Sequence, residues 1–104
     1  MPGIDVNYFI RQANKLQKEL EQKRSDLANQ TVEGSAGDLV KVVVTGSQEL
    51  RSIKIDPKAL EGGDVAMLED LVMAAMNQGL ENSRQLMKTE LEKISGGVRI
   101  PGLT

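Results

Sequence analysis

The sequence predicts one domain of the α+β class, residues 1–104, in which two long helices flank a three-stranded antiparallel sheet and a short helical turn precedes the second helix. Three observations predict this fold. Apolar residues recur with a helical period near both ends, β-branched residues alternate in the middle, and glycine-containing turns separate the segments. A chain of 104 residues forms only a modest core, so association with a second copy is a natural way to bury more apolar surface.

The first predicted helix covers about residues 6–29, which contain no Gly or Pro. Its apolar residues recur at spacings of four, three, four and seven, which is close to a heptad pattern. These residues are Phe9, Ala13, Leu16, Leu20 and Leu27. Asp5 or Asn7 is expected to cap the start, because either side chain can accept hydrogen bonds from the free N–H groups of a first turn.

The opposite side of this helix is basic. Between Tyr8 and Arg24 there are five basic residues and two acidic ones. The five are Arg11, Lys15, Lys18, Lys23 and Arg24. At about 100° per residue, Arg11, Lys15 and Lys18 lie within roughly 60° of one another and opposite the apolar stripe. We call these three residues the basic ridge.

Three strands are predicted at residues 31–32, 39–45 and 50–55, where β-branched residues and period-two alternation replace the helical pattern. Gly34 and Gly37 are interpreted as the two ends of the first turn, and residues 46–48 as the second turn. Both connections are short enough for antiparallel hairpins. In the central strand Val40, Val42 and Val44 share one face and are predicted core residues, while the other face is only partly polar.

The last helix is predicted at about residues 65–95, after a break at Asp56-Pro57 and a helical turn in residues 58–63. Asp64 is its expected N-cap. Because its first half is apolar almost all round, we expect burial on more than one side, including a subunit interface. Gly79 inside it is expected to permit a close approach. The predicted core or dimer-interface residues outside the central strand are Ile53, Ile55, Leu68, Leu71, Val72, Ala75 and Met76.

The second half of this helix carries two basic residues, and glycines mark its expected end. Arg84 and Lys88 lie one turn apart beside the apolar stripe of its second half. Its four methionines are interpreted as packing residues in preference to a pliable binding surface. Gly96-Gly97 is expected to stop the helix, and residues 97–104 are expected to form a flexible tail.

Composition excludes several kinds of chemistry. The chain has no Cys and no His, so cysteine nucleophiles, thiolate metal sites and His-based general-base systems are absent. The glycines form no GxGxxG motif or P-loop. The acids Glu61, Asp64, Glu69 and Asp70 are interpreted as residues that cap or solvate a helix start, in preference to metal ligands. The sequence therefore predicts a protein without enzyme activity, cofactor or metal.

The order of elements resembles that of the YbaB/EbfC family over essentially the whole chain. The similarity rests on Gly37 before the central strand, Gly46 at the next turn, residues 53–57 (IKIDP) at the end of the third strand, and residues 68–71 (LEDL) in the long helix. The resemblance implies small bacterial proteins that form tweezer-shaped homodimers, bind DNA with limited sequence preference and associate with the nucleoid. The family's longer Gly/Met-rich N-terminal lead is shortened here to MPGIDV.

The resemblance favours a role in DNA binding for the basic residues. Without it, Lys at three- and four-residue spacings opposite an apolar stripe is better explained as a plain solvated helix face. The predicted contacts to double-stranded DNA are Arg11, Lys15, Lys18, Lys23, Arg24, Arg84 and Lys88, placed to neutralise phosphates from two copies of the chain. The net charge of −2 gives no basic surplus, so an uneven distribution of charge is required.

Two alternative functions stay open. One is an adaptor for replication or recombination proteins, and the other is a chaperone-like module whose helical arms hold unfolded chains. Nowhere does the sequence have 18 consecutive apolar residues or a basic leader followed by a long apolar run, so no membrane segment or secretory signal is expected. The expected location is the cytoplasm, in association with the nucleoid.

Overall fold

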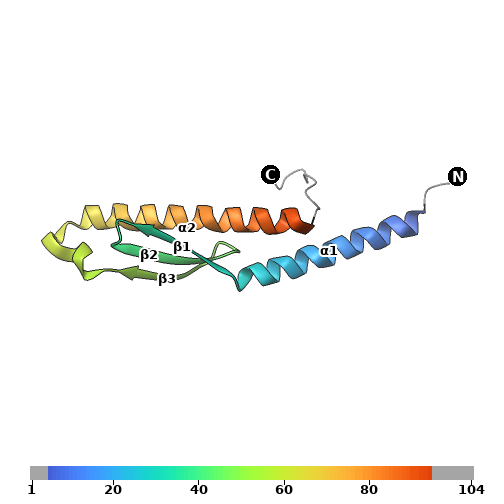
Figure 1. The fold of residues 1–104 in the computed structure, drawn as a ribbon, viewed down its shortest axis with the longest axis horizontal. Helices are drawn as coiled ribbons and strands as arrows, with labels where there is room; N and C mark the ends of the chain where they lie inside the picture. The colour runs from blue at the N-terminus through green and yellow to red at the C-terminus, as the bar shows by residue number, and fades with distance from the viewer. Residues whose placement is uncertain (1–4, 95–104) are drawn as a thin grey trace.

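The computed structural model describes residues 5–94, and these form an elongated body of 77 × 21 × 16 Å. The elements in chain order are α1 (Val6–Ala28), β1 (Thr31–Ala36), β2 (Val40–Thr45), β3 (Leu50–Ile55), the 3-10 helix η1 (Pro57–Gly63) and α2 (Val65–Ile94). α2 lies along one face of the sheet, and α1 extends beyond the C-terminal end of α2 (Figure 1). The predicted α+β class and element order are confirmed, whereas the expected tail at residues 97–104 lies outside the described residues.

Short polar side chains cap the helices as the sequence predicts. Asp5 begins α1, where its carboxylate accepts a hydrogen bond from the Tyr8 backbone N–H at 3.2 Å. Asp64 does the same for α2, accepting from the Met67 N–H at 3.0 Å. Each bond satisfies an N–H group that has no partner within the helix, which stabilises the helix start by about 1 kcal/mol.

The sheet has the order β1-β2-β3 with antiparallel neighbours. The first turn is tighter than the sequence suggests, because β1 continues through Gly34 to Ala36 and only residues 37–39 form the turn, with Gly37 and Asp38 at positive φ. The interpretation of Gly34 as one end of the turn is therefore wrong. Gly34 pairs with Val42 inside the strand, and its lack of a side chain serves packing.

The core lies between the sheet and α2. Val40, Val42, Val44 and Ala75 are fully buried, and Val42 and Val44 face Gly79 of α2. The close approach predicted at Gly79 is confirmed, because an added Cβ there would lie 2.9 Å from a methyl carbon of each valine. Half-buried apolar residues surround this cluster: Val32, Ala36, Leu68, Leu71, Val72, Met76 and Leu80.

Polar side chains of α2 cover the outer edge of β1. The Ser35 N–H donates to Gln78 Oε1 at 2.6 Å, and Asn82 Nδ2 donates to the Glu33 carbonyl at 2.8 Å. These groups point away from β2 and would otherwise be free to pair with another strand. α2 therefore both buries one face of the sheet and closes one of its edges.

The other edge strand, β3, is left open. Its pairing with β2 contains an irregularity between Val43 and Val44, so that Leu50, Ile53 and Ile55 lie opposite Val44, Val42 and Val40. These three side chains lie on the same face of the sheet as the valines of β2 that α2 covers. Each is nevertheless more than 40% exposed. An apolar strip on β3 thus lies uncovered in the single chain.

Candidate nucleic-acid interface

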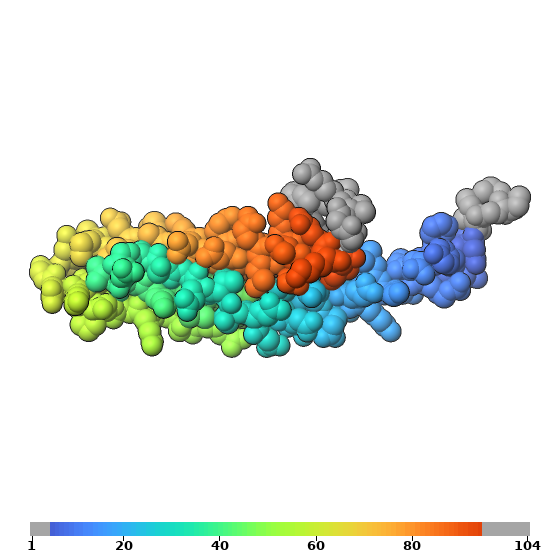
Figure 2. Space-filling model, viewed as in Figure 1, coloured from blue at the N-terminus to red at the C-terminus, as the bar shows by residue number. Residues whose placement is uncertain are grey.

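The basic ridge lies on the part of α1 that projects from the body. We call residues 6–20 the α1 arm. Figure 2 shows the start of α1 projecting well beyond the C-terminal end of α2. Arg11, Lys15 and Lys18 are exposed on the arm, as the helical spacing predicts. Arg11 lies 4.0 Å from Asp5, and Lys15 and Lys18 form no ion pair within residues 5–94. The ridge therefore offers its positive charge to solvent.

The base of α1 is held against the β2–β3 turn. Leu27 is fully buried, and its carbonyl accepts a hydrogen bond from the Gly46 N–H at 3.0 Å. One guanidinium nitrogen of Arg51 donates to the Ala28 carbonyl at 3.0 Å. The last turn of α1 is thus fixed to the β2–β3 turn and to β3, and this attachment positions the arm and its ridge.

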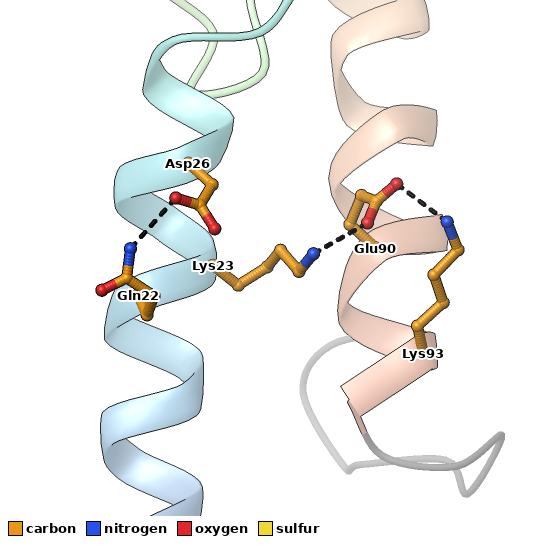
Figure 3. A network of polar contacts seen from close by, with 5 residues as sticks. All are labelled: Gln22, Lys23, Asp26, Glu90 and Lys93. Atoms are coloured by element: carbon orange, nitrogen blue, oxygen red, sulfur yellow. Dashed lines mark hydrogen bonds and ion pairs between the residues drawn. The ribbon is translucent and has the colours of Figure 1, made fainter.

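Lys23 occupies a different environment from the ridge. Its ammonium group donates to Glu90 of α2 at 3.1 Å, and Lys93 donates to the other oxygen of the same carboxylate at 3.0 Å (Figure 3). Hydrogen bonds from Lys93 and then Lys23 hold the pKa of Glu90 below its ordinary value. The structure therefore places Lys23 between the helices, whereas Arg24 is exposed on α1.

The two predicted residues of α2 lie by the β2–β3 turn. Arg84 and Lys88 line a depression of about 380 Å³ together with Gln48. Arg84 is paired with Glu81, whose carboxylate accepts from both Nε at 3.2 Å and Nη2 at 3.0 Å. Hydrogen bonds from Gln85 and then Arg84 lower the pKa of Glu81. The charge of Arg84 is thus partly compensated, and among the described residues Lys88 has no ion pair.

Two further lysines were not predicted from the sequence. Lys41 of β2 and Lys54 of β3 lie directly opposite each other and line a depression of about 740 Å³ on the sheet. Glu33 lies 3.7 Å from Lys41 and lines the same depression. The pairing register of the β2–β3 hairpin is the signal that places these two lysines opposite each other. The acidic neighbour makes this surface a weaker candidate for phosphate than the ridge.

The predicted acidic residues lie at the opposite end of the molecule from the arm. Glu61 is in η1, Asp64 caps α2, and Glu69 and Asp70 follow in its first two turns, at the end farthest from the N-terminus (Figure 1). No group of three acidic side chains within residues 5–94 is arranged to hold a metal ion. The charge of the chain is therefore separated along its long axis.

The predicted core or interface residues fall into two groups. Val40, Val42, Val44 and Ala75 form the core, with Leu68, Leu71, Val72 and Met76 packed around it. Ile53 and Ile55 lie on the open strip of β3. The first half of α2 is also less enclosed than its composition suggests, because Val65 and Met73 are more than 60% exposed in the single chain.

Comparison with known proteins identifies the family. A model of the YbaB/EbfC DNA-binding family matches residues 1–98. The chain belongs to the YbaB/EbfC DNA-binding family. A protein of Myxococcus xanthus named a nucleoid-associated protein is 58% identical over 105 residues, which cover all of both chains. A nucleoid-associated protein of Caldanaerobacter subterraneus subsp. tengcongensis is 45% identical, covering 97% of this chain and 92% of its own.

The fold of this YbaB/EbfC chain also matches a solved structure. The crystal structure of an uncharacterized protein from Helicobacter pylori superposes with a TM-score of 0.80, covering 90% of this chain and 100% of that one. The identity is 22%, so the likeness concerns the fold. None of the helices within residues 5–94 is both long enough and apolar enough to cross a lipid bilayer.

Proposed function

We propose that this chain is a non-enzymatic nucleoid protein that binds double-stranded DNA as a homodimer, with low sequence specificity, through the basic ridges of its α1 arms. The observation that carries the proposal is the exposed ridge of Arg11, Lys15 and Lys18 on a projecting helix of a DNA-binding family member. Binding of this kind serves nucleoid organisation and, through it, gene expression or DNA repair.

The chemistry of the ridge favours phosphates over bases. Arg11 and Lys18 are seven residues apart, which is about 10 Å along the helix, so one ridge reaches several phosphates of a duplex. Phosphate contacts position a protein without reading sequence, and a lysine ammonium lacks the planar fork with which arginine reads guanine. Affinity that tolerates different sequences and falls steeply with salt is the expected result.

The separation of charge explains how a chain with a net charge of −2 binds DNA. Glu61, Asp64, Glu69 and Asp70 lie at the far end of the body from the arm (Figure 1). A duplex that contacts the ridge is held away from these acids by more than a Debye length, which is about 8 Å at physiological salt. The acidic end also orients the approach to DNA.

The open strip of β3 supports the homodimer. Leu50, Ile53 and Ile55 are exposed beside the core, and Met73 is exposed on α2. A strip of this kind on an unpaired edge strand invites either aggregation or a specific partner. Packing of the β3 strip against a second copy removes its apolar side chains from solvent and brings two basic ridges into one dimer. Ile53→Lys is expected to give monomers in light scattering, while Lys54→Ile leaves the dimer intact.

The test is fluorescence anisotropy of a labelled duplex against the full chain at several salt concentrations. Arg11, Lys15 and Lys18 are replaced together by Gln, and the control replaces Lys41, Lys54 and Lys58 together, which removes the same charge from other exposed sites. The slope of log K against log salt is expected to shrink by about 0.9 for each lost phosphate contact in the ridge variant only. Equal slopes in the wild type and the ridge variant would refute the assignment.

A second candidate function is a protein adaptor for replication or recombination factors. The observation that favours it is the set of apolar residues exposed on the α1 arm, among them Val6, Phe9 and Ile10. An adaptor would bind a defined protein at moderate salt and give no shift of labelled DNA at low salt. The same anisotropy series therefore separates the two functions.

A further inference from the structure

The two aromatic residues of the chain lie next to each other at the tip of the α1 arm. The sequence has one Tyr, one Phe and no Trp, and Tyr8 and Phe9 are both in the first turn of α1. Tyr8 is 50% exposed and Phe9 is 59% exposed. Aromatic side chains usually dominate a core because of their large apolar area. Here neither is in the core, so the exposed pair indicates a contact with another molecule.

Tyr8 lies on the basic side of the arm. At about 100° per residue, it is about 20° from Lys15 and about 60° from Arg11 around the helix axis. Along the axis Arg11 is only about 4.5 Å farther on. Asp5 is close by, but its carboxylate accepts the Tyr8 backbone N–H and lies 4.0 Å from Arg11. An exposed aromatic ring and the basic ridge therefore share one face of the helix.

Phe9 holds the ring of Tyr8 in place. The two ring centroids are 5.7 Å apart and the ring planes are 78° from parallel, which is an edge-to-face arrangement. This arrangement is favourable for aromatic pairs, so it limits the rotation of the Tyr8 side chain before a ligand arrives. A side chain that is already positioned loses less conformational entropy when it binds. Tyr8 is thus a preorganised aromatic surface that remains half exposed.

We propose that Tyr8 is a binding site for an unpaired nucleobase, through which the arm holds single-stranded DNA. Proteins hold single strands with cations that neutralise phosphates and aromatic rings on which bases stack. A base inside a duplex is already stacked on its neighbours, and unstacking it costs free energy, so an unpaired base is the better ligand. The cations beside Tyr8 favour an anionic strand over an apolar protein surface. The inference rests on the proposed function, because the basic ridge holds the backbone while Tyr8 holds the base.

The tyrosine emission of the full chain provides the test, because Tyr8 is the only Tyr and the chain has no Trp. An oligothymidylate strand is titrated at low salt, and the same strand paired with oligoadenylate is the control ligand. A base stacked on the phenol ring quenches its emission. The single strand is therefore expected to remove most of the emission, and the duplex is expected to change it little.

A matched variant controls for quenching that does not involve stacking at position 8. Tyr8→Phe combined with Ile10→Tyr moves the only tyrosine about 160° around the helix and keeps an aromatic ring at position 8. Ile10 is 51% exposed, so the new side chain has room. This variant is expected to bind the single strand as the wild type does, while its tyrosine emission stays unchanged.

Fluorescence anisotropy of the labelled strand and the labelled duplex measures the affinities. Tyr8→Ala is expected to weaken single-strand binding by about fivefold or more and duplex binding by less than about twofold, because only the single strand loses a stacked base. Tyr8→Phe is expected to keep both affinities. The hydrogen bond to Asp5 comes from the backbone N–H of Tyr8, so the helix start survives these changes, and far-UV circular dichroism checks it.

The outcomes separate this inference from the proposed function. Single-strand binding that leaves the Tyr8 emission unchanged would overturn the inference alone. Equal quenching by strand and duplex, or equal losses of the two affinities in Tyr8→Ala, would do the same. Failure of both DNA forms to bind at low salt would overturn the proposed function as well. Replacing the basic ridge by Gln is expected to weaken both ligands, whereas Tyr8→Ala weakens the single strand.

Discussion

Replacing Gly34 by Ala is expected to destabilise the fold more than any other addition of a single methyl group to this sheet. A Cβ at Gly34 would overlap the Ala75 carbonyl and the Gly79 backbone, with the Gly79 Cα only 2.8 Å away. These are backbone atoms of α2, so no side-chain rotation relieves the overlap and the helix must move away from β1. Overpacking in a core typically costs about 1–3 kcal/mol, and a clash with backbone on one side belongs at the upper end, about 3 kcal/mol.

Gly79→Ala is the informative comparison, because it adds the same methyl group to the other side of this contact. There the new Cβ would meet methyl groups of Val42 and Val44 at 2.9 Å, and side chains can adjust. Alanine also gains about 1 kcal/mol over glycine within a helix. The net loss for Gly79→Ala is therefore expected to be smaller, about 1 kcal/mol. Adding Val44→Ala should relieve one of the two overlaps at position 79 but none of the overlap at position 34.

Urea unfolding followed by circular dichroism measures both effects, at one fixed protein concentration because association with a second copy would add to the apparent stability. A loss of about 3 kcal/mol lowers Tm by roughly 12–24 °C in a domain of this size. A free energy of unfolding for Gly34→Ala within about 0.5 kcal/mol of the wild-type value would be a change ordinary for surface substitutions. That result would refute the reasoning, because it would show that the close contact between α2 and β1 does not limit the packing.

Three other substitutions test the attachments of the helices. Leu27→Ala removes a fully buried side chain beside Gly46 and is expected to cost about 2–5 kcal/mol in urea unfolding, with earlier hydrogen exchange at the base of α1. Ser83→Ala removes the donor to the Thr45 carbonyl at 2.6 Å and is expected to cost about 1–3 kcal/mol; a neutral result would show that the buried carbonyl finds another donor. Glu90→Gln tests pH dependence: the native pKa is lowered, so the carboxylate contributes stability above its ordinary pKa of 4.5 and loses it as pH falls through the lowered value. Acid titrations of unfolding should therefore converge below that range for the wild type and the variant, and curves that stay parallel would contradict the role of Lys23 and Lys93.

Local patterns predict most of the elements because the signals that define them are local. A period of 3.6 and an Asp cap place both helices within one or two residues of their observed ends. The sequence pattern assigns Gly34 wrongly, because glycine within a strand and glycine at a turn look alike in sequence. Its purpose depends on Ala75 and Gly79, about forty residues away, and only the packing of α2 against β1 brings them together.

Contacts between distant parts of the chain also decide the surroundings of the predicted DNA-contact residues, which the sequence alone does not give. Helical geometry alone places Arg11, Lys15 and Lys18 on one face, and they lie exposed as expected. The environment of Lys23 depends on Glu90, which is 67 residues away and carries no signal linking the two. The exposure of Ile53 likewise depends on how much of the sheet α2 covers, which the strand pattern does not encode.

The basic ridge and the open strip of β3 make the two parts of the proposed function separable. The ridge acts through charge, so its neutralisation by Gln should alter the salt dependence of DNA binding and leave the dimer in light scattering intact. The strip acts through apolar packing, so Ile53→Lys should give monomers at any salt concentration. If dimer formation also strengthens DNA binding, it does so by placing two ridges in one particle and raising the effective concentration of the second. That gain would disappear in the Ile53→Lys variant, whereas the number of ions released per bound ridge would stay the same.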